Sequence, residues 1–235
     1  MNLVSLYEKL DNSHNLKDAV SSIFINFHSY QIERLKNASF KDFFDKNNQT
    51  RLLISGFSKT EHITGKIQKQ YDDACGKYVW EPMVYYVGNQ FGSLWKFPEN
   101  SQKIESDKEE RLDFFGELKN FQGGVGAFEV KSSNTTLNRN DKKGQITKCE
   151  GMIKRKQYDY CILFECLSKS KKRKTKFKEI SNNVFQISGE KIWEKITTDN
   201  NYYYKILKEI NDFDKHFFIK EREREVRRII QEARK

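Results

Sequence analysis

The sequence predicts an α/β protein in which a central mixed β-sheet is flanked by helices. Apolar residues recur at helical spacing over residues 1–75 and 190–235, whereas short β-prone runs dominate residues 78–188. Between residues 127 and 167, a strand, a helix and a buried strand follow one another, which is the order of a βαβ unit with parallel strands. With 235 residues, 37% of them hydrophobic, the chain is long enough to form one large domain with its own core.

The N-terminal part, residues 1–75, is expected to be a helical layer. One of its helices is predicted over residues 51–75, because Ser58 or Thr60 can cap it and apolar side chains follow at helical spacing. Glu61 lies in the first turn of this helix, from which an acid can reach a site on a neighbouring sheet. The helix dipole alone favours a Glu at this position, so Glu61 is not counted among the candidate site residues.

Residues 78–97 are rich in β-prone side chains and are predicted to form a strand pair or an irregular β region. Turn signals follow at residues 88–89 and 92–93. Residues 98–110 are rich in Glu, Lys and Ser and are expected to be a solvated loop. The β-prone residues are Val79, Trp80, Met83, Val84, Tyr85, Tyr86, Val87, Leu94 and Trp95.

The strand predicted over residues 127–132 carries charge on one face only. Side chains alternate between the two faces of a strand, so Glu129 and Lys131 point one way. Phe128 and Val130 point the other way, into a core. A carboxylate and an ammonium therefore lie side by side at one rim of the predicted sheet.

Residues 111–115 form another short apolar run with one acid inside it, Asp113, and residues 112–118 are predicted to be a strand. If this run is a strand beside residues 127–132, Asp113 can be brought next to Glu129. Two carboxylates and Lys131, converging where strands end, form a site that can hold a divalent metal ion and activate a water molecule.

The segment that follows is predicted to return the chain to the same sheet. Residues 134–144 are polar and without periodicity, which predicts a loop, and residues 145–156 have a helical apolar face. Residues 158–167 are strongly apolar and are predicted to be a buried strand. An active site at the strand ends of such a sheet is a common arrangement.

Asp113, then Glu129-Val130-Lys131, then a helix and a buried strand, resemble the core of the PD-(D/E)xK nucleases, whose best-known small members are type II restriction endonucleases. The resemblance covers about residues 111–167, and Leu112 stands where the family often has Pro. Glu117-Leu118-Lys119 has the same Glu-x-Lys spacing, but no comparable strand-borne acid precedes it.

The resemblance implies a fold and a chemistry. The fold is a single nuclease domain over residues 1–235, with its catalytic sheet in residues 78–188. Asp113, Glu129 and the main-chain carbonyl of Val130 would hold Mg²⁺, and Lys131 would contact the scissile phosphate or orient the attacking water. An ordinary surface salt bridge between Lys131 and Glu129 is the alternative for that pair.

The formal net charge of +10, from 43 Lys and Arg against 33 Asp and Glu, predicts a polyanionic partner, double-stranded DNA before membrane. A bias in codon usage toward Lys is the alternative. The densest basic run, residues 168–178, would neutralise phosphates, or else is a solvated turn. The candidate DNA-binding residues are Lys171, Lys172 and Arg173 in this run, and Asn134, Asn138, Arg139, Asn140 and Gln145, whose amide and guanidinium groups can read base edges unless they belong to a plain polar loop.

Residues 190–235 are predicted to be helical, because Ile192 with Ile196 and Ile206 with Ile210 are spaced by one helical turn. The highly charged last part, residues 220–235, is compatible with three roles: a helix along DNA, half of a dimer contact, or a solvated terminal helix.

Several classes of protein are disfavoured by what the sequence lacks. The four cysteines have no Cys-x-x-Cys spacing, so neither a zinc site nor a disulfide framework is expected. No run approaches the roughly 20 apolar residues of a membrane span. The first residues lack the basic-then-apolar pattern of a signal peptide, so a soluble, cytoplasmic protein is expected.

The function predicted from these observations is that of a type II restriction endonuclease that cuts a short duplex DNA site with Mg²⁺. A homodimer is expected because a palindromic site suits a two-fold symmetric protein. The alternatives are a repair or recombination nuclease with the same core, and a basic DNA-binding protein without catalytic activity.

Overall fold

The computed structural model describes residues 3–44, 54–91, 93–96, 113–118, 121–133, 139–155, 157–167 and 177–233. Its sheet contains β1 (Ser93–Lys96), β2 (Phe114–Glu117), β3 (Gly126–Ser133), β4 (Tyr160–Leu167), β5 (Phe177–Ser181) and β6 (Val184–Ser188). The helices are α1 (Leu3–Asp11), α2 (Leu16–Asn37), α3 (Phe40–Phe43), α5 (Lys59–Cys75), α6 (Glu81–Phe91), α7 (Arg139–Lys154), α8 (Glu190–Thr197), α9 (Tyr202–Asp212) and α10 (His216–Glu232). A single π-helical segment, Gly76–Trp80, joins α5 to α6.

The sheet is mixed and has the strand order β1-β2-β3-β4-β6-β5. The first three strands form an antiparallel meander, and β3, β4 and β6 are parallel to one another. β5 pairs antiparallel with β6 at the far edge. The expected mixed sheet and the parallel β3-α7-β4 unit are therefore confirmed.

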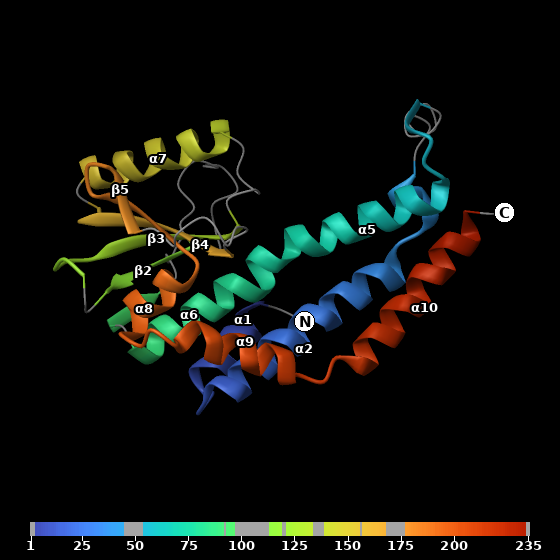
Figure 1. The fold of residues 1–235 in the computed structure, drawn as a ribbon, viewed down its shortest axis with the longest axis horizontal. Coiled ribbons are helices and arrows are strands. Elements are labelled where there is room, and N and C mark those ends of the chain that lie inside the picture. The colour runs from blue at the N-terminus through green and yellow to red at the C-terminus, as the bar shows by residue number, and fades with distance from the viewer. Residues whose placement is uncertain are drawn as a thin grey trace.

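Helices cover both faces of the sheet (Figure 1). On one face α7 contacts β4 and β6, and a small core forms around Ala127, Cys149 and Leu163. The other face carries Phe128 and Phe164, whose rings stack at 5.7 Å between centroids, and α6 and α8 contact it. Phe128 and Val130 both belong to this larger core, which confirms the predicted alternation of side chains along β3.

Two cysteines of the α7 face are joined in the structure. Cys149 of α7 and Cys161 of β4 form a disulfide, whereas the sequence spacing predicts none. A helix residue and a strand residue that both face the same small core can meet without any of the short spacings that mark disulfide or metal motifs.

The turn before β3 is fixed by polar contacts with the start of β4. The Val125 N–H donates to the Asp159 carboxylate at 2.7 Å, and Gly124 adopts a φ of 102°, which favours glycine. A Cβ at Gly124 would come within 2.2 Å of that carboxylate. The Tyr160 hydroxyl accepts a hydrogen bond from the Leu118 N–H at 3.1 Å. These contacts set where β2 ends and β3 begins, and so support their register.

The prediction of strands over residues 78–97 is wrong for most of its length. Glu81–Phe91 is the helix α6, and within this range only Ser93–Lys96 is a strand among the described residues. Every residue from Pro82 to Gly88 is buried, so the helix is apolar on all sides. A short apolar run of this kind has neither helical nor strand periodicity, and Pro82 is compatible with a first helical turn.

Two further segments differ from the sequence prediction. The helix α7 begins at Arg139, inside the expected polar loop 134–144. This start is not visible in the sequence, because the first turns of α7 are polar and carry no apolar periodicity. The strand β5 overlaps the basic run 168–178. It lies at the edge of the sheet, where exposed charged residues such as Lys178 and Glu179 are typical and hide the strand pattern.

Three helices, α2, α5 and α10, extend away from the sheet as an arm (Figure 1). α5 begins as predicted, with Ser58 as N-cap, and Glu61 accepts hydrogen bonds from the backbone and hydroxyl of Ser58. Glu61 is therefore a capping residue. Ile63 and Ile67 are buried along the inner face of the helix, as its periodicity predicts.

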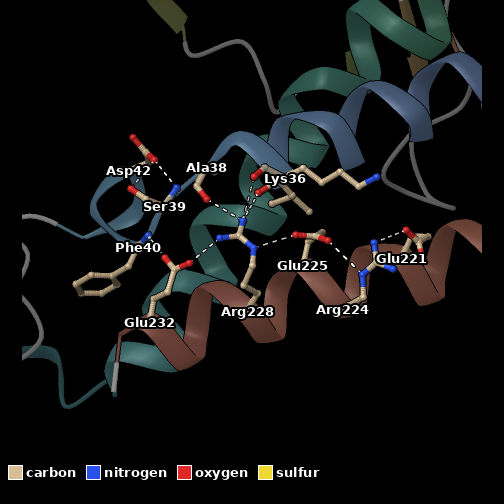
Figure 2. A network of polar contacts seen from close by, with 11 residues as sticks. Lys36, Ala38, Ser39, Phe40, Asp42, Glu221, Arg224, Glu225, Arg228 and Glu232 are labelled. Carbon is tan, nitrogen blue, oxygen red and sulfur yellow. Dashed lines mark hydrogen bonds and ion pairs between the residues drawn. The ribbon is translucent and has the colours of Figure 1, made fainter. Parts of the chain in front are cut away.

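Within the arm, Arg228 connects α10 to the C-terminal end of α2 (Figure 2). Its guanidinium donates to the carbonyl oxygens of Leu35 and Ala38, both at 2.8 Å, and of Lys36 at 3.3 Å. It also pairs with Glu225 at 3.0 Å and with Glu232 at 2.6 Å. Arg228 thus supplies donors to carbonyl oxygens at the C-terminal end of α2 and its C-cap, where the regular helical hydrogen bonds stop. Among the described helices, none is both long enough and apolar enough to span a membrane.

Candidate active site

The antiparallel register of β2 and β3 brings Asp113 next to Glu129. Phe114 lies opposite Phe128 and Phe115 opposite Ala127, so the next step of the same register places Asp113 opposite Glu129. The Val130 N–H donates to the Asp113 carboxylate at 2.6 Å, which fixes that side chain against β3. Two acids from different segments therefore meet where β2 begins, beside the middle of β3.

Lys131 lies on the same face of β3 as Glu129. Its Nζ is 3.4 Å from Glu129 Oε2. Glu129 is only 3% exposed, whereas the Lys131 side chain retains 26% of its accessible surface. The pair is therefore not an exposed surface salt bridge, because its acid is buried.

A second amine, which the sequence analysis does not predict, reaches Glu129 from α7. The Lys148 Nζ forms an ion pair with Glu129 Oε1, so both oxygens of this carboxylate contact an ammonium group. Lys148 is one of many lysines in the chain and belongs to no motif. The available signal is its position beside Cys149, which marks the inner face of the helix.

A third acid is contributed by α6. Glu81 is the first residue of this helix and is partly buried. Burial, followed by the negative charge of Asp113, raises the pKa of Glu81 to about 8. Glu81 has no signal in the sequence, because strands are predicted in this region and Glu61 is the acid expected on a helix.

The charges of the site act on one another. Burial and then the charge of Glu129 raise the pKa of Asp113 to about 6, against the opposing effects of Lys131 and the Val130 N–H. Burial alone would lower the pKa of Lys131, but the negative charges of Asp113 and Glu129 outweigh it and hold this pKa above its ordinary value. The acids are therefore crowded, and the lysine stays protonated at neutral pH.

The carboxylates of Asp113, Glu129 and Glu81 are hard oxygen donors, the kind of ligand that Mg²⁺ prefers. Burial is the larger cause of the raised pKa values of Asp113 and Glu81, and the negative charge of a neighbouring acid is the second; a divalent cation would offset that charge. In the described part of the chain, no three Asp, Glu, His or Cys side chains are already arranged as a metal-binding group. The acids fit such an ion by their chemistry, while amines contact both oxygens of Glu129.

Most of the predicted DNA-binding residues cannot be placed. Asn134, Asn138, Lys171, Lys172 and Arg173 lie outside the described residues. Arg139 and Asn140 belong to the first turn of α7, and the structure does not describe their side chains. Gln145 is half-buried on α7, with its Oε1 buried and without a hydrogen-bond partner among the described residues. Its amide oxygen is therefore buried in the structure, and its proposed contact with a base stays a prediction.

Comparison with known proteins does not assign the chain to a family. No family model matches the sequence, and no curated protein matches it. The functional conclusion therefore depends on the residues that the fold brings together.

Proposed function

We propose that the protein is a Mg²⁺-dependent endonuclease that cuts double-stranded DNA, of the type II restriction kind. The observation that carries this proposal is the position of Asp113 opposite Glu129, with Lys131 two residues further along β3. The helix α7 and the parallel strand β4 follow, in the order that the resemblance to PD-(D/E)xK nucleases implies.

In this proposal the acids hold the metal ion. Asp113 and Glu129 would bind Mg²⁺ together with the main-chain carbonyl of Val130. The N–H of Val130 faces Asp113, and strand geometry directs the carbonyl of the same residue to the same side. Burial and then the charges of both acids raise the pKa of Glu81, which would add a third carboxylate to the site. When bound, the ion supplies an activated water and neutralises charge on the phosphate.

Lys131 would contact the scissile phosphate or orient the attacking water. Its amine is partly exposed and remains protonated at neutral pH because of the neighbouring acids. A fixed positive charge at this place stabilises the negative charge that develops in the transition state. Asp113 and Glu129 thus set both the metal site and the charge state of the lysine.

DNA as the substrate is supported by the net charge of +10, which favours a polyanionic ligand. A homodimer is proposed for the same reason as before: two symmetric cuts in a palindromic site require two active sites. A structure-specific repair or recombination nuclease would use the same residues on a different DNA shape.

A panel of substrates tests the proposal. The protein is incubated with Mg²⁺ and, in separate reactions, with plasmid, linear duplex and branched DNA. A restriction enzyme gives discrete fragments from the plasmid, whereas a structure-specific nuclease cuts the branched substrate alone. Retarded DNA without any cleavage, over a range of Mg²⁺ and Mn²⁺ concentrations, would contradict the enzymatic proposal and favour a DNA-binding protein.

A further inference from the structure

Glu129 is held by two amines that come from different elements. Lys131 is its neighbour on β3, and its Nζ lies 3.4 Å from Oε2. Lys148 projects from α7 onto Oε1, the other oxygen. The Glu129 side chain is 4% exposed and that of Lys148 is 19% exposed, so their contact is largely withdrawn from water.

A buried carboxylate of this kind needs a partner. Removing water from a charged group is unfavourable unless an opposite charge or hydrogen-bond donors replace the water. In the metal-free protein Lys148 and Lys131 supply that charge. Lys148 therefore offsets the charge of Glu129 and holds its carboxylate in place when no metal ion is bound.

The same contact opposes a metal ion at Glu129. A divalent ion bound to Oε1 would lie near the ammonium of Lys148, and two positive charges at such a distance repel each other strongly where water is scarce. Such an ion would repel the Lys131 ammonium less, because the Lys131 nitrogen lies near the other oxygen, Oε2, and the Lys131 side chain is partly exposed. The ion and the Lys148 ammonium are thus alternatives for one oxygen.

We propose that Lys148 is a positioning residue, a resident counter-ion of Glu129 that competes with the divalent metal ion for this carboxylate. The proposal depends on the function proposed above, since it assigns Glu129 to the metal site. It gives α7 a role beyond covering the sheet, because the helix then sets the metal concentration at which the enzyme becomes active.

The test measures metal affinity directly, without relying on cleavage. Ca²⁺ is titrated into the metal-free full-length protein by calorimetry, with wild type, Lys148→Met, Lys148→Gln and Lys148→Arg. Loss of the competing charge is expected to lower the Ca²⁺ dissociation constant about tenfold in the Met and Gln variants. Lys148→Arg retains the charge and should bind Ca²⁺ like wild type. Lys154→Met, which removes an exposed lysine from the last turn of α7, is the matched control and should change nothing.

Cleavage kinetics provide a second readout. The Mg²⁺ concentration for half-maximal cleavage should fall in Lys148→Met, while the rate at saturating Mg²⁺ stays within about threefold of wild type. A residue that merely supports the fold would weaken metal binding when removed, so the sign of the change separates the two roles.

The outcomes also separate this inference from the proposed function. If wild type neither binds the ion nor cleaves DNA, the proposed function is wrong. If wild type does both, and the Met and Gln variants bind Ca²⁺ as wild type does or more weakly, the competition is wrong and the proposed function stands. Thermal melting checks that each variant is folded, and unfolding of both neutral variants would make Lys148 a structural residue and overturn the inference.

Discussion

Glu129 is the residue on which the charges of the site converge. Asp113 lies opposite, Lys131 and Lys148 pair with its two oxygens, and Glu81 lies near enough to be affected by its charge. The arrangement is built from buried acids that repel one another and amines that offset them. Changes of single residues here are therefore expected to alter stability and activity in opposite directions.

Glu81→Gln should stabilise the metal-free protein at high pH. The pKa of Glu81 is raised in the folded protein to about 8, so folding favours its protonated form and loses stability as the pH rises toward 8. A neutral Gln avoids this loss. The melting temperature at pH 8 should rise by about a few degrees in the variant, and the difference should vanish below about pH 4.5, where Glu81 is protonated in both states.

Cleavage by Glu81→Gln should be slower, because a proposed metal ligand has lost its charge. Exposed Glu8→Gln in α1 is the control and should match wild type in both measurements. A melting temperature of Glu81→Gln at pH 8 that is lower than that of wild type would show that the ionised Glu81 carboxylate does not destabilise the folded protein.

His28 of α2 should make the arm sensitive to acid. Its ring stacks on Phe218 at 5.1 Å, and its Nε2 is buried without a hydrogen-bond partner among the described residues. Burial, with the charges of Arg222 and Lys215, lowers its pKa to about 4. The stability that the neutral ring provides is present above about pH 6.5 and is lost as the pH falls toward 4.

Urea unfolding at pH 7 and pH 4.5 measures this effect. Because the His28 ring is partly exposed, solvent screening reduces the loss, and wild type should lose on the order of 1–2 kcal/mol more than His28→Phe between these pH values. An equal loss in both proteins would mean that His28 is not the group that titrates.

Sequence reasoning was effective for single residues only where a regular period exposed them. Glu129 and Lys131 were predicted because alternation along a strand separates them from Phe128 and Val130. Glu81 carries no such signal, since it precedes a run that is buried on all sides. Lys148 is one lysine among many, and only the packing of α7 against β4 and β6, which brings it to Glu129, selects it.

Among the elements, α10 packs on the arm through apolar residues such as Ile229, and one arginine adds polar contacts to the end of α2. Arg228 donates to carbonyl oxygens at the end of α2 and pairs with Glu225 and Glu232 on its own helix. Glu232 in turn accepts from the Phe40 N–H at 3.2 Å, at the start of α3. A planar guanidinium with five donors can serve all these partners, whereas a lysine ammonium cannot.

Arg228→Lys should therefore destabilise the protein although it keeps the charge. The lost hydrogen bonds to carbonyl oxygens are expected to lower the free energy of unfolding by about 1–2 kcal/mol in urea denaturation, after allowing for the partial exposure of Arg228. Arg227→Lys is the matched control, because Arg227 pairs with Glu223 of the same helix in an exposed ion pair, and its effect should stay below about 0.5 kcal/mol. Equal losses for the two variants would contradict the capping role of Arg228.

The unit formed by β3, α7 and β4 could be predicted because the hydrophobic pattern of each element matches its burial in the fold. The β3-α7-β4 unit combines a half-charged strand, a helix with an apolar stripe and a fully buried strand, which are three distinct signals. α6 and β5 lack such signals. One is apolar on every side, and the other is a short edge strand next to a run of basic residues.

For the molecule as a whole, the sheet and the arm form one structure in which a compact α/β part carries the site and three helices project from it (Figure 1). The sequence predicted the mixed sheet, and it predicted helices at both ends of the chain. It could not predict the arm, because the packing of α10 along α2 joins segments nearly 200 residues apart, and no local pattern encodes that contact.

Binding to duplex DNA should depend steeply on salt, since the net charge is +10 and the proposed ligand is a polyanion. Fluorescence anisotropy with Ca²⁺ in place of Mg²⁺ measures this between about 50 and 200 mM salt, where a protein that makes several phosphate contacts loses at least about tenfold in affinity. An affinity that does not change over this range would argue against DNA as the partner.

The rate of DNA cleavage by Asp113→Asn, compared with wild type and with the exposed acid variant Asp73→Asn, is the measurement that we would make first. Asn can still accept the Val130 N–H, so the loop and strand are expected to stay in place while one negative charge is lost. We expect cleavage with Mg²⁺ to fall by at least about 100-fold, which is roughly 3 kcal/mol of activation free energy, with DNA affinity in Ca²⁺ unchanged. A rate for Asp113→Asn equal to those of wild type and Asp73→Asn would contradict the site described above.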